Sequence, residues 1–172
     1  MESTIASLSP DQAQRAIMIF CDLVPTSFWE GGARPSPAKI ERTVEKLEDN
    51  APPEARPIVE ALSGGTEEQK GEIAKALLNT FHEQETLSGF VDQAVEQAQQ
   101  PHLSPLPLIV GALTLVLLSG VRLKAGGGKG VQLEIAVTDN IKALTGGIET
   151  IVKQIPKATL GKLFPKLMAF GS

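Results

Sequence analysis

The chain has 172 residues, of which 42% are hydrophobic and 21% are charged, the ordinary composition of a folded protein of one or two small domains. Aromatic residues make up only 4% and tyrosine is missing, which argues against a stacking platform for single-stranded nucleic acid, so we expect no nucleic-acid partner. The net charge of −4 combines −9 over residues 1–120 with +5 over residues 121–172, and this asymmetry predicts different partners for the two ends.

Residues 1–100 have the pattern of an acidic bundle of five short amphipathic helices. Capping-box sequences at Ser9–Gln12 and Thr66–Gln69 predict two of the helix starts, and Ser36-Pro37 predicts a third. In each helix the apolar residues recur at positions i, i+3 and i+4, which predicts one buried face per helix. The predicted faces contain Ala13, Ala16, Ile17, Phe20 and Val24; Ile40, Val44 and Leu47; Ile58, Val59 and Leu62; Ile73, Leu77, Leu78 and Phe81; and Leu87, Phe90, Val91, Ala94 and Val95.

Three residues of this region are candidates for chemistry or binding. Cys21, the single cysteine, lies in an apolar run, so we expect a buried thiol in a reducing compartment rather than a nucleophile. His82 has Glu83 and Glu85 nearby, but the spacing matches no metal-ligand pattern, and a surface histidine is the better interpretation. Trp29 follows Phe28 in a predicted loop and is either a core residue or an exposed partner-binding anchor; it is our candidate partner-binding residue.

A proline-rich linker, residues 101–107, precedes an apolar stretch with no charged residue from Leu106 to Val121. A membrane-spanning helix needs about 20 apolar residues, so this stretch is at the short edge of the range. It predicts either a segment that inserts into a bilayer or a buried element of a soluble core. The candidate membrane-contact residues are Leu108, Ile109, Val110, Leu113, Leu115, Val116, Leu117 and Leu118.

Two runs that alternate apolar and polar residues, Val121–Ala125 and Val131–Val137, flank the loop Gly126–Gly130 and predict a β-hairpin. The loop sequence AGGGKG is not a Walker phosphate loop, because no Ser or Thr follows the lysine and no helix follows the loop. The remaining residues form a basic amphipathic end, a composition that suits anionic lipid. The candidate lipid-headgroup residues are Lys153, Lys157, Lys162 and Lys166.

This order of parts, with LPLIVGALTLVLLSGV and VRLKAGGGKGVQLEIAV following the bundle, resembles small bacterial proteins of conflict and defence systems. Those proteins pair an N-terminal helical bundle, of the effector-associated or death-like kind, with a short hydrophobic segment. The resemblance implies an adaptor or membrane-acting effector that assembles with itself or with partners. It rests on architecture, so no functional residue is carried over from it.

We therefore predict a mainly α protein: an acidic helical bundle (1–100), a linker (101–107), and a region (108–172) with a short hydrophobic segment, a small β-hairpin and basic amphipathic C-terminal helices. The expected function is that of a non-enzymatic membrane-acting effector or adaptor, cytoplasmic and peripheral to or inserted in the inner membrane. Expected partners are membrane lipid or a protein, and a homo-oligomer is expected. No catalytic residue, cofactor or metal is predicted; an enzyme using Cys21 or a histidine is the weakest hypothesis. The alternative is a soluble α+β interaction module in which residues 106–137 form a small buried sheet.

The first twelve residues, MESTIASLSPDQ, lack a basic and a hydrophobic region, so we expect no secretory signal.

Overall fold

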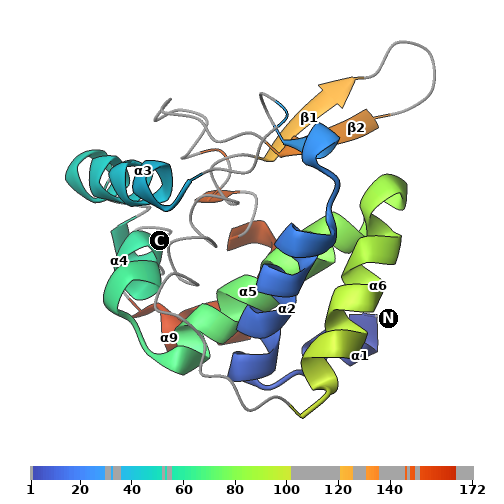
Figure 1. Cartoon of the computed structure of the whole chain (residues 1–172). Coiled ribbons are helices and arrows are strands. Elements are labelled where there is room, and N and C mark those ends of the chain that lie inside the picture. Colours follow the sequence, from blue (N-terminus) through green and yellow to red (C-terminus); the bar gives the residue numbers. More distant parts are fainter. Residues whose placement is uncertain are drawn as a thin grey trace.

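The computed structural model describes residues 2–29, 32, 36–51, 53, 56–101, 121–125, 131–135, 146, 148–149 and 152–165. Within these residues the protein is mainly α-helical, as predicted, and most of its helices form one bundle (Figure 1). The elements are α1 (Glu2–Ala6), α2 (Pro10–Leu23), a 3-10 turn η1 (Thr26–Phe28), α3 (Pro37–Asn50), α4 (Arg56–Gly64), α5 (Glu67–His82), α6 (Glu85–Gln99), β1 (Val121–Ala125), β2 (Val131–Ile135) and α9 (Lys157–Leu163).

Both predicted capping boxes are present and confirm the starts of α2 and α5. The Gln12 backbone N–H donates to Ser9 Oγ over 3.1 Å, and the Ser9 backbone N–H donates to Gln12 Oε1 over 2.9 Å. Thr66 and Gln69 make the same reciprocal pair at 3.2 and 3.0 Å. Each pair satisfies two backbone N–H groups at or beside the helix start, where the helix itself supplies no acceptor.

The centre of the bundle is formed by α2, α5 and α6, which contact one another pairwise. Phe20 of α2 and Phe81 of α5 are fully buried there, and their rings stack with centroids 4.7 Å apart. Helix α1 was not predicted, because five residues are too few for a helical stripe. It nevertheless packs on α5, and Ile5 and Leu8 are buried in the same core.

Gly71 lies where α5 passes closest to the start of α2. A Cβ atom at this position would lie 2.5 Å from Pro10 Cα, so α2 would have to move away. We expect Gly71→Ala to lower the free energy of unfolding by about 1–3 kcal/mol, as overpacking does. The matched control is Gly89→Ala at an exposed position of α6, where nothing lies within 4 Å and alanine should stabilise by about 0.5–1 kcal/mol. Urea unfolding of both variants measures the difference, and equal midpoints would contradict the close approach.

The C-terminal part of the chain shares the core of the bundle. Ile148, Ile155, Leu160, Leu163 and Phe164 are buried and belong to the same hydrophobic cluster as the residues of α2, α4 and α5. The core of the bundle is therefore completed by side chains from the C-terminal part of the chain. The division into residues 1–100, 101–107 and 108–172 stays a prediction.

Strands β1 and β2 pair as an antiparallel hairpin. The register places Arg122 opposite Glu134 and Lys124 opposite Gln132. Opposite charges at paired positions favour this register.

Candidate functional site

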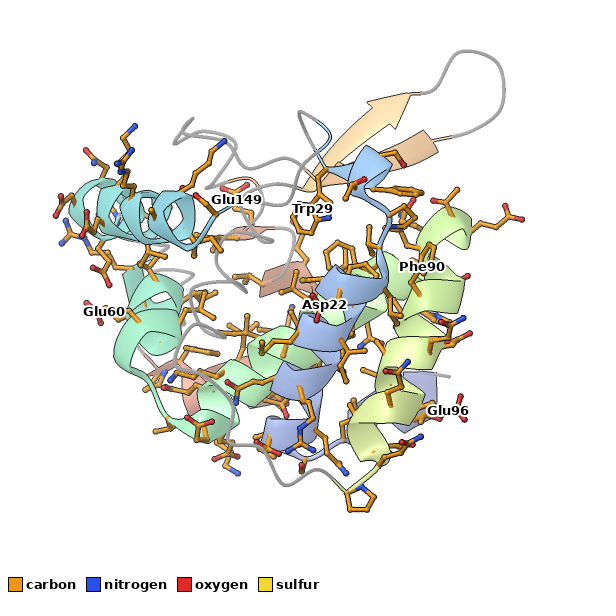
Figure 2. All side chains as sticks on the ribbon, viewed as in Figure 1. Asp22, Trp29, Glu60, Phe90, Glu96 and Glu149 are labelled. Atoms are coloured by element: carbon orange, nitrogen blue, oxygen red, sulfur yellow. The ribbon has the colours of Figure 1, made fainter. Side chains whose placement is uncertain are left out.

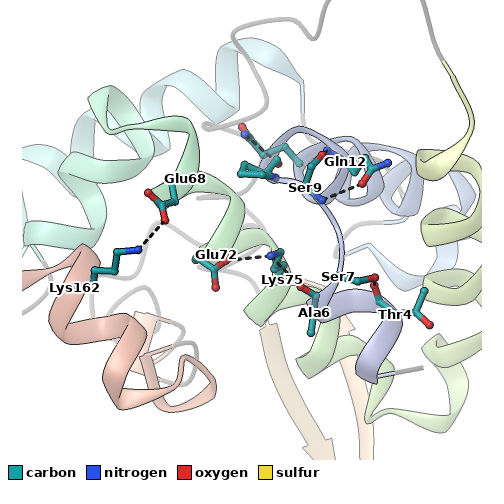
Figure 3. Close-up of polar contacts among 11 residues, drawn as sticks. Thr4, Ala6, Ser7, Ser9, Gln12, Glu68, Glu72, Lys75 and Lys162 are labelled. Carbon is teal, nitrogen blue, oxygen red and sulfur yellow. Dashed lines mark hydrogen bonds and ion pairs between the residues drawn. The ribbon is translucent and has the colours of Figure 1, made fainter.

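The most informative contact in the described structure joins the middle of the chain to its C-terminal part. We call residues 152–165 the C-terminal segment, and residues 57–72, where α4 turns into α5, the α4–α5 corner. Gln69 Nε2 donates a hydrogen bond of 2.8 Å to the backbone carbonyl of Leu163. Lys162 Nζ lies 3.7 Å from Glu68 Oε1 (Figure 3). The basic segment is thus attached to the acidic start of α5.

Gln69 has two functions at this corner. Its Oε1 accepts from the Thr66 backbone N–H and so caps α5, while its Nε2 holds the C-terminal segment at Leu163. Gln12 occupies the same place in the capping box of α2, where its side chain accepts a local hydrogen bond from the Ser9 backbone N–H. The two glutamines therefore form a matched pair in which Gln69 carries an additional long-range contact.

Among the acidic residues at the start of α5, Glu68 is the one whose ion pair reaches the C-terminal segment. Glu67 accepts a hydrogen bond of 2.8 Å from Gln14 of α2. Glu72 pairs with Lys75, whose ammonium also donates to the carbonyl of Ala6 in α1 (Figure 3). Glu67 and Glu72 thus connect elements of the bundle, and Glu68 supplies the charge complementarity for the basic end.

Apolar burial contributes more to this contact than the ion pair does. Leu160, Leu163 and Phe164 are 5%, 8% and 2% exposed, and burying a side chain of this kind stabilises by about 1.5–3 kcal/mol. The side chains of Lys162 and Glu68 are 77% and 56% exposed, and such a pair contributes about 0–1 kcal/mol. The polar contacts therefore fix where the segment sits, while the three apolar side chains hold it there.

Two shallow recesses border the contact. One, of about 340 Å³, lies between α4 and the end of α9 and is lined by Pro57, Glu60, Ala61, Gly64, Gly65, Gln69, Leu163, Phe164 and Pro165. The other, of about 280 Å³, is lined by Glu68, Glu72, Ala158, Thr159, Lys162 and Leu163. Both recesses combine side chains of the C-terminal segment with side chains of the α4–α5 corner.

The structure places the other sequence candidates as follows. Trp29 is 3% exposed within the core (Figure 2), as the core alternative predicted, and its indole Nε1 has no hydrogen-bond partner among the described residues. Cys21 is buried, as predicted. His82 Nε2 lies 3.2 Å from Asp92 Oδ1, across the α5–α6 contact, without the alignment of a hydrogen bond. Within the described residues, no three His, Cys, Asp or Glu side chains are grouped to hold a metal ion.

Of the four lipid-headgroup candidates, Lys153, Lys157 and Lys162 are exposed, and Lys166 lies outside the described residues. All eight membrane-contact candidates, from Leu108 to Leu118, also lie outside them. In the part of the chain that is described, no helix is both long and apolar enough to cross a bilayer.

Sequence reasoning missed Glu68 and Gln69 as contact residues. It placed both in a capping box, correctly, but that local pattern carries no sign of a partner 94 positions later in the chain. Comparison of the chain with protein-family models, curated proteins and solved structures finds no match.

Proposed function

We propose that this protein is a non-enzymatic effector or adaptor that acts at a lipid bilayer. The uncharged stretch, residues 106–121, and the basic C-terminal end engage the membrane, while the helical bundle binds a protein partner or a second copy of the chain. The setting we propose is a bacterial conflict or defence system, at the cytoplasmic face of the inner membrane. The observation that carries the proposal is an uncharged run of 16 residues followed by a region of net charge +5.

The two faces of the C-terminal segment support this proposal. Lys153, Lys157 and Lys162 are exposed, while Leu160, Leu163 and Phe164 are buried. A helix with lysines on one face and large apolar residues on the other is typical of segments that lie in a membrane interface. The exposed lysines give the C-terminal segment a basic surface, even while its apolar face is buried, and anionic headgroups attract this surface.

The direct test is sedimentation of the full chain with vesicles. We expect the protein to pellet with vesicles that contain phosphatidylglycerol and to pellet less with pure phosphatidylcholine, because the attraction to anionic headgroups is electrostatic. Added salt should weaken the association, since the Debye length falls from about 10 Å at 0.1 M to about 3 Å at 1 M. Failure to pellet with either kind of vesicle would overturn the proposal.

The lysines of the segment give a second prediction. Changing Lys153, Lys157 and Lys162 to Gln should weaken binding to anionic vesicles by on the order of 100-fold, from about 1 kcal/mol per lysine. The control removes three charges from exposed positions of α3 (Lys39→Gln, Arg42→Gln and Lys46→Gln). If the lysines serve instead to attach the segment to the acidic bundle, the first variant will melt earlier and its vesicle affinity will not change.

The burial of Ile148, Ile155, Leu160, Leu163 and Phe164 in the core of the bundle favours a second candidate function. In this alternative the protein is a soluble α+β interaction module, and residues 106–137, which include β1 and β2, form a small buried sheet. Substitutions in the apolar stretch separate the two candidates, because a core residue affects folding whereas a lipid-facing residue affects vesicle binding.

A further inference from the structure

We propose that the α4–α5 corner holds α9 in a releasable, autoinhibitory contact, and that an anionic bilayer competes with the corner for the apolar face of α9. The inference rests on the proposed function and adds its regulation. It follows from the contacts of Glu68 and Gln69 with the C-terminal segment, which no local sequence pattern requires.

The first step is that one apolar face has two possible sites. Leu160, Leu163 and Phe164 are the large apolar side chains described in and beside α9, and all three are buried in the cluster of the bundle. An interfacial helix binds a bilayer by burying its apolar face among the acyl chains. The same three side chains cannot fill both places, so docking on the corner and insertion into lipid exclude each other.

The second step is that α9 depends on its surroundings for its helical form. It has seven residues, no side-chain cap at Pro156, and a glycine, Gly161, in its interior. Isolated helices shorter than about 12–15 residues are marginal in water. Helices α2, α5 and α6 pack directly on one another, through contacts that do not pass through α9. Release of α9 is therefore expected to open one edge of the core while those three helices stay together.

The third step concerns the two polar contacts Lys162–Glu68 and Gln69–Leu163, which together we call the latch: the first faces solvent and the second is partly buried. The Lys162–Glu68 pair is mostly exposed, so salt screens it and a phosphate headgroup can replace the carboxylate as the partner of the ammonium. The Gln69–Leu163 contact is a single hydrogen bond to one backbone carbonyl. A bilayer can thus take over the charge and the apolar face together.

Gln69→Glu tests the latch, with Gln12→Glu as its matched control. Glutamate keeps a capping box intact, so both helix starts survive. At position 69 it removes the N–H donor and places a carboxylate against the Leu163 carbonyl. We expect amide hydrogen exchange over residues 160–164 of the full chain to become about tenfold faster in Gln69→Glu, the change expected for one lost hydrogen bond. Gln12→Glu should leave it unchanged.

The linked readout is affinity for vesicles of phosphatidylcholine and phosphatidylglycerol. If the form with α9 docked on the α4–α5 corner dominates, the apparent affinity for vesicles rises by the same factor as the population with α9 released. Gln69→Glu should therefore bind vesicles about tenfold more tightly than wild type. Unchanged exchange in α2 and α6 confirms that the variant is folded. Glu68→Gln is a second variant, expected to shift both quantities in the same direction, with an effect that disappears at high salt.

The possible failures are distinguishable. Faster exchange without tighter binding overturns the competition, and so does tighter binding without faster exchange. Wild-type protein that binds vesicles as tightly as both variants overturns the latch while the proposed function stands. If none of the proteins binds vesicles, even with α9 released, the proposed function and this inference fall together.

Discussion

Phe81→Ala is expected to lower the free energy of unfolding by about 3–5 kcal/mol. The Phe81 side chain is fully buried in α5, and its ring stacks on that of Phe20 with an interplanar angle of 14°. Truncation removes the ring contact between Phe81 and Phe20 and leaves a cavity at the centre of the bundle. Because domains are stable by only about 5–15 kcal/mol, the loss is a large part of the total. Thermal unfolding should show it as a shift of about 2–4 °C per kcal/mol.

Phe90→Ala is the control for this prediction. Phe90 and Phe28 also form an aromatic pair, with an edge-to-face geometry and centroids 6.3 Å apart, but both side chains are only partly buried at the rim of the bundle. Truncation there should cost less than half as much, because less apolar area returns to water and no enclosed cavity forms. Equal losses of unfolding free energy for Phe81→Ala and Phe90→Ala would show that the central ring pair stabilises the bundle no more than the pair at its rim.

Helices α2, α3 and α5 were predictable because their signals are local. Ser9, Ser36 and Thr66 each accept a hydrogen bond from the backbone N–H three residues later, and a cap of this kind is legible in a few letters of sequence. The apolar faces also followed from spacing, since residues such as Ile17 and Leu77 are fully buried in the structure. Element boundaries and core faces thus depend on chemistry within one or two helical turns.

The docking of α9 was not predictable in the same way. Its contacts with Glu68 and Gln69 span more than 90 positions, and nothing in KATLGKL specifies which surface its apolar side chains will cover. The charge asymmetry between the two parts of the chain allowed an intramolecular contact but equally allowed anionic lipid. Trp29 is a similar case, because an aromatic residue after a helix has the same sequence pattern whether it is buried or exposed.

The apolar stretch gives the prediction with the largest expected effect on binding. Leu115→Asp together with Leu118→Asp should abolish association of the full chain with anionic vesicles. Each carboxylate at the bilayer centre costs about 2.5–3.5 kcal/mol on insertion scales, so two of them offset the affinity of a short segment. A matched control, Thr86→Asp with Gln93→Asp, adds the same charge at exposed positions of α6. It should pellet as wild type does, which separates the effect of position from that of added negative charge.

Thermal unfolding of the same double variant decides between the two candidate functions. A segment that faces lipid is not needed for the core, so the Leu115→Asp, Leu118→Asp protein should melt near the wild-type temperature while vesicle binding is lost. If residues 106–137 instead form a buried sheet, each aspartate is an unpaired buried charge, and several kcal/mol of stability disappear. If the double variant is unfolded and the wild-type protein does not bind vesicles, the membrane proposal is wrong and the interaction module is favoured. A folded variant that no longer pellets assigns residues 106–121 to the bilayer.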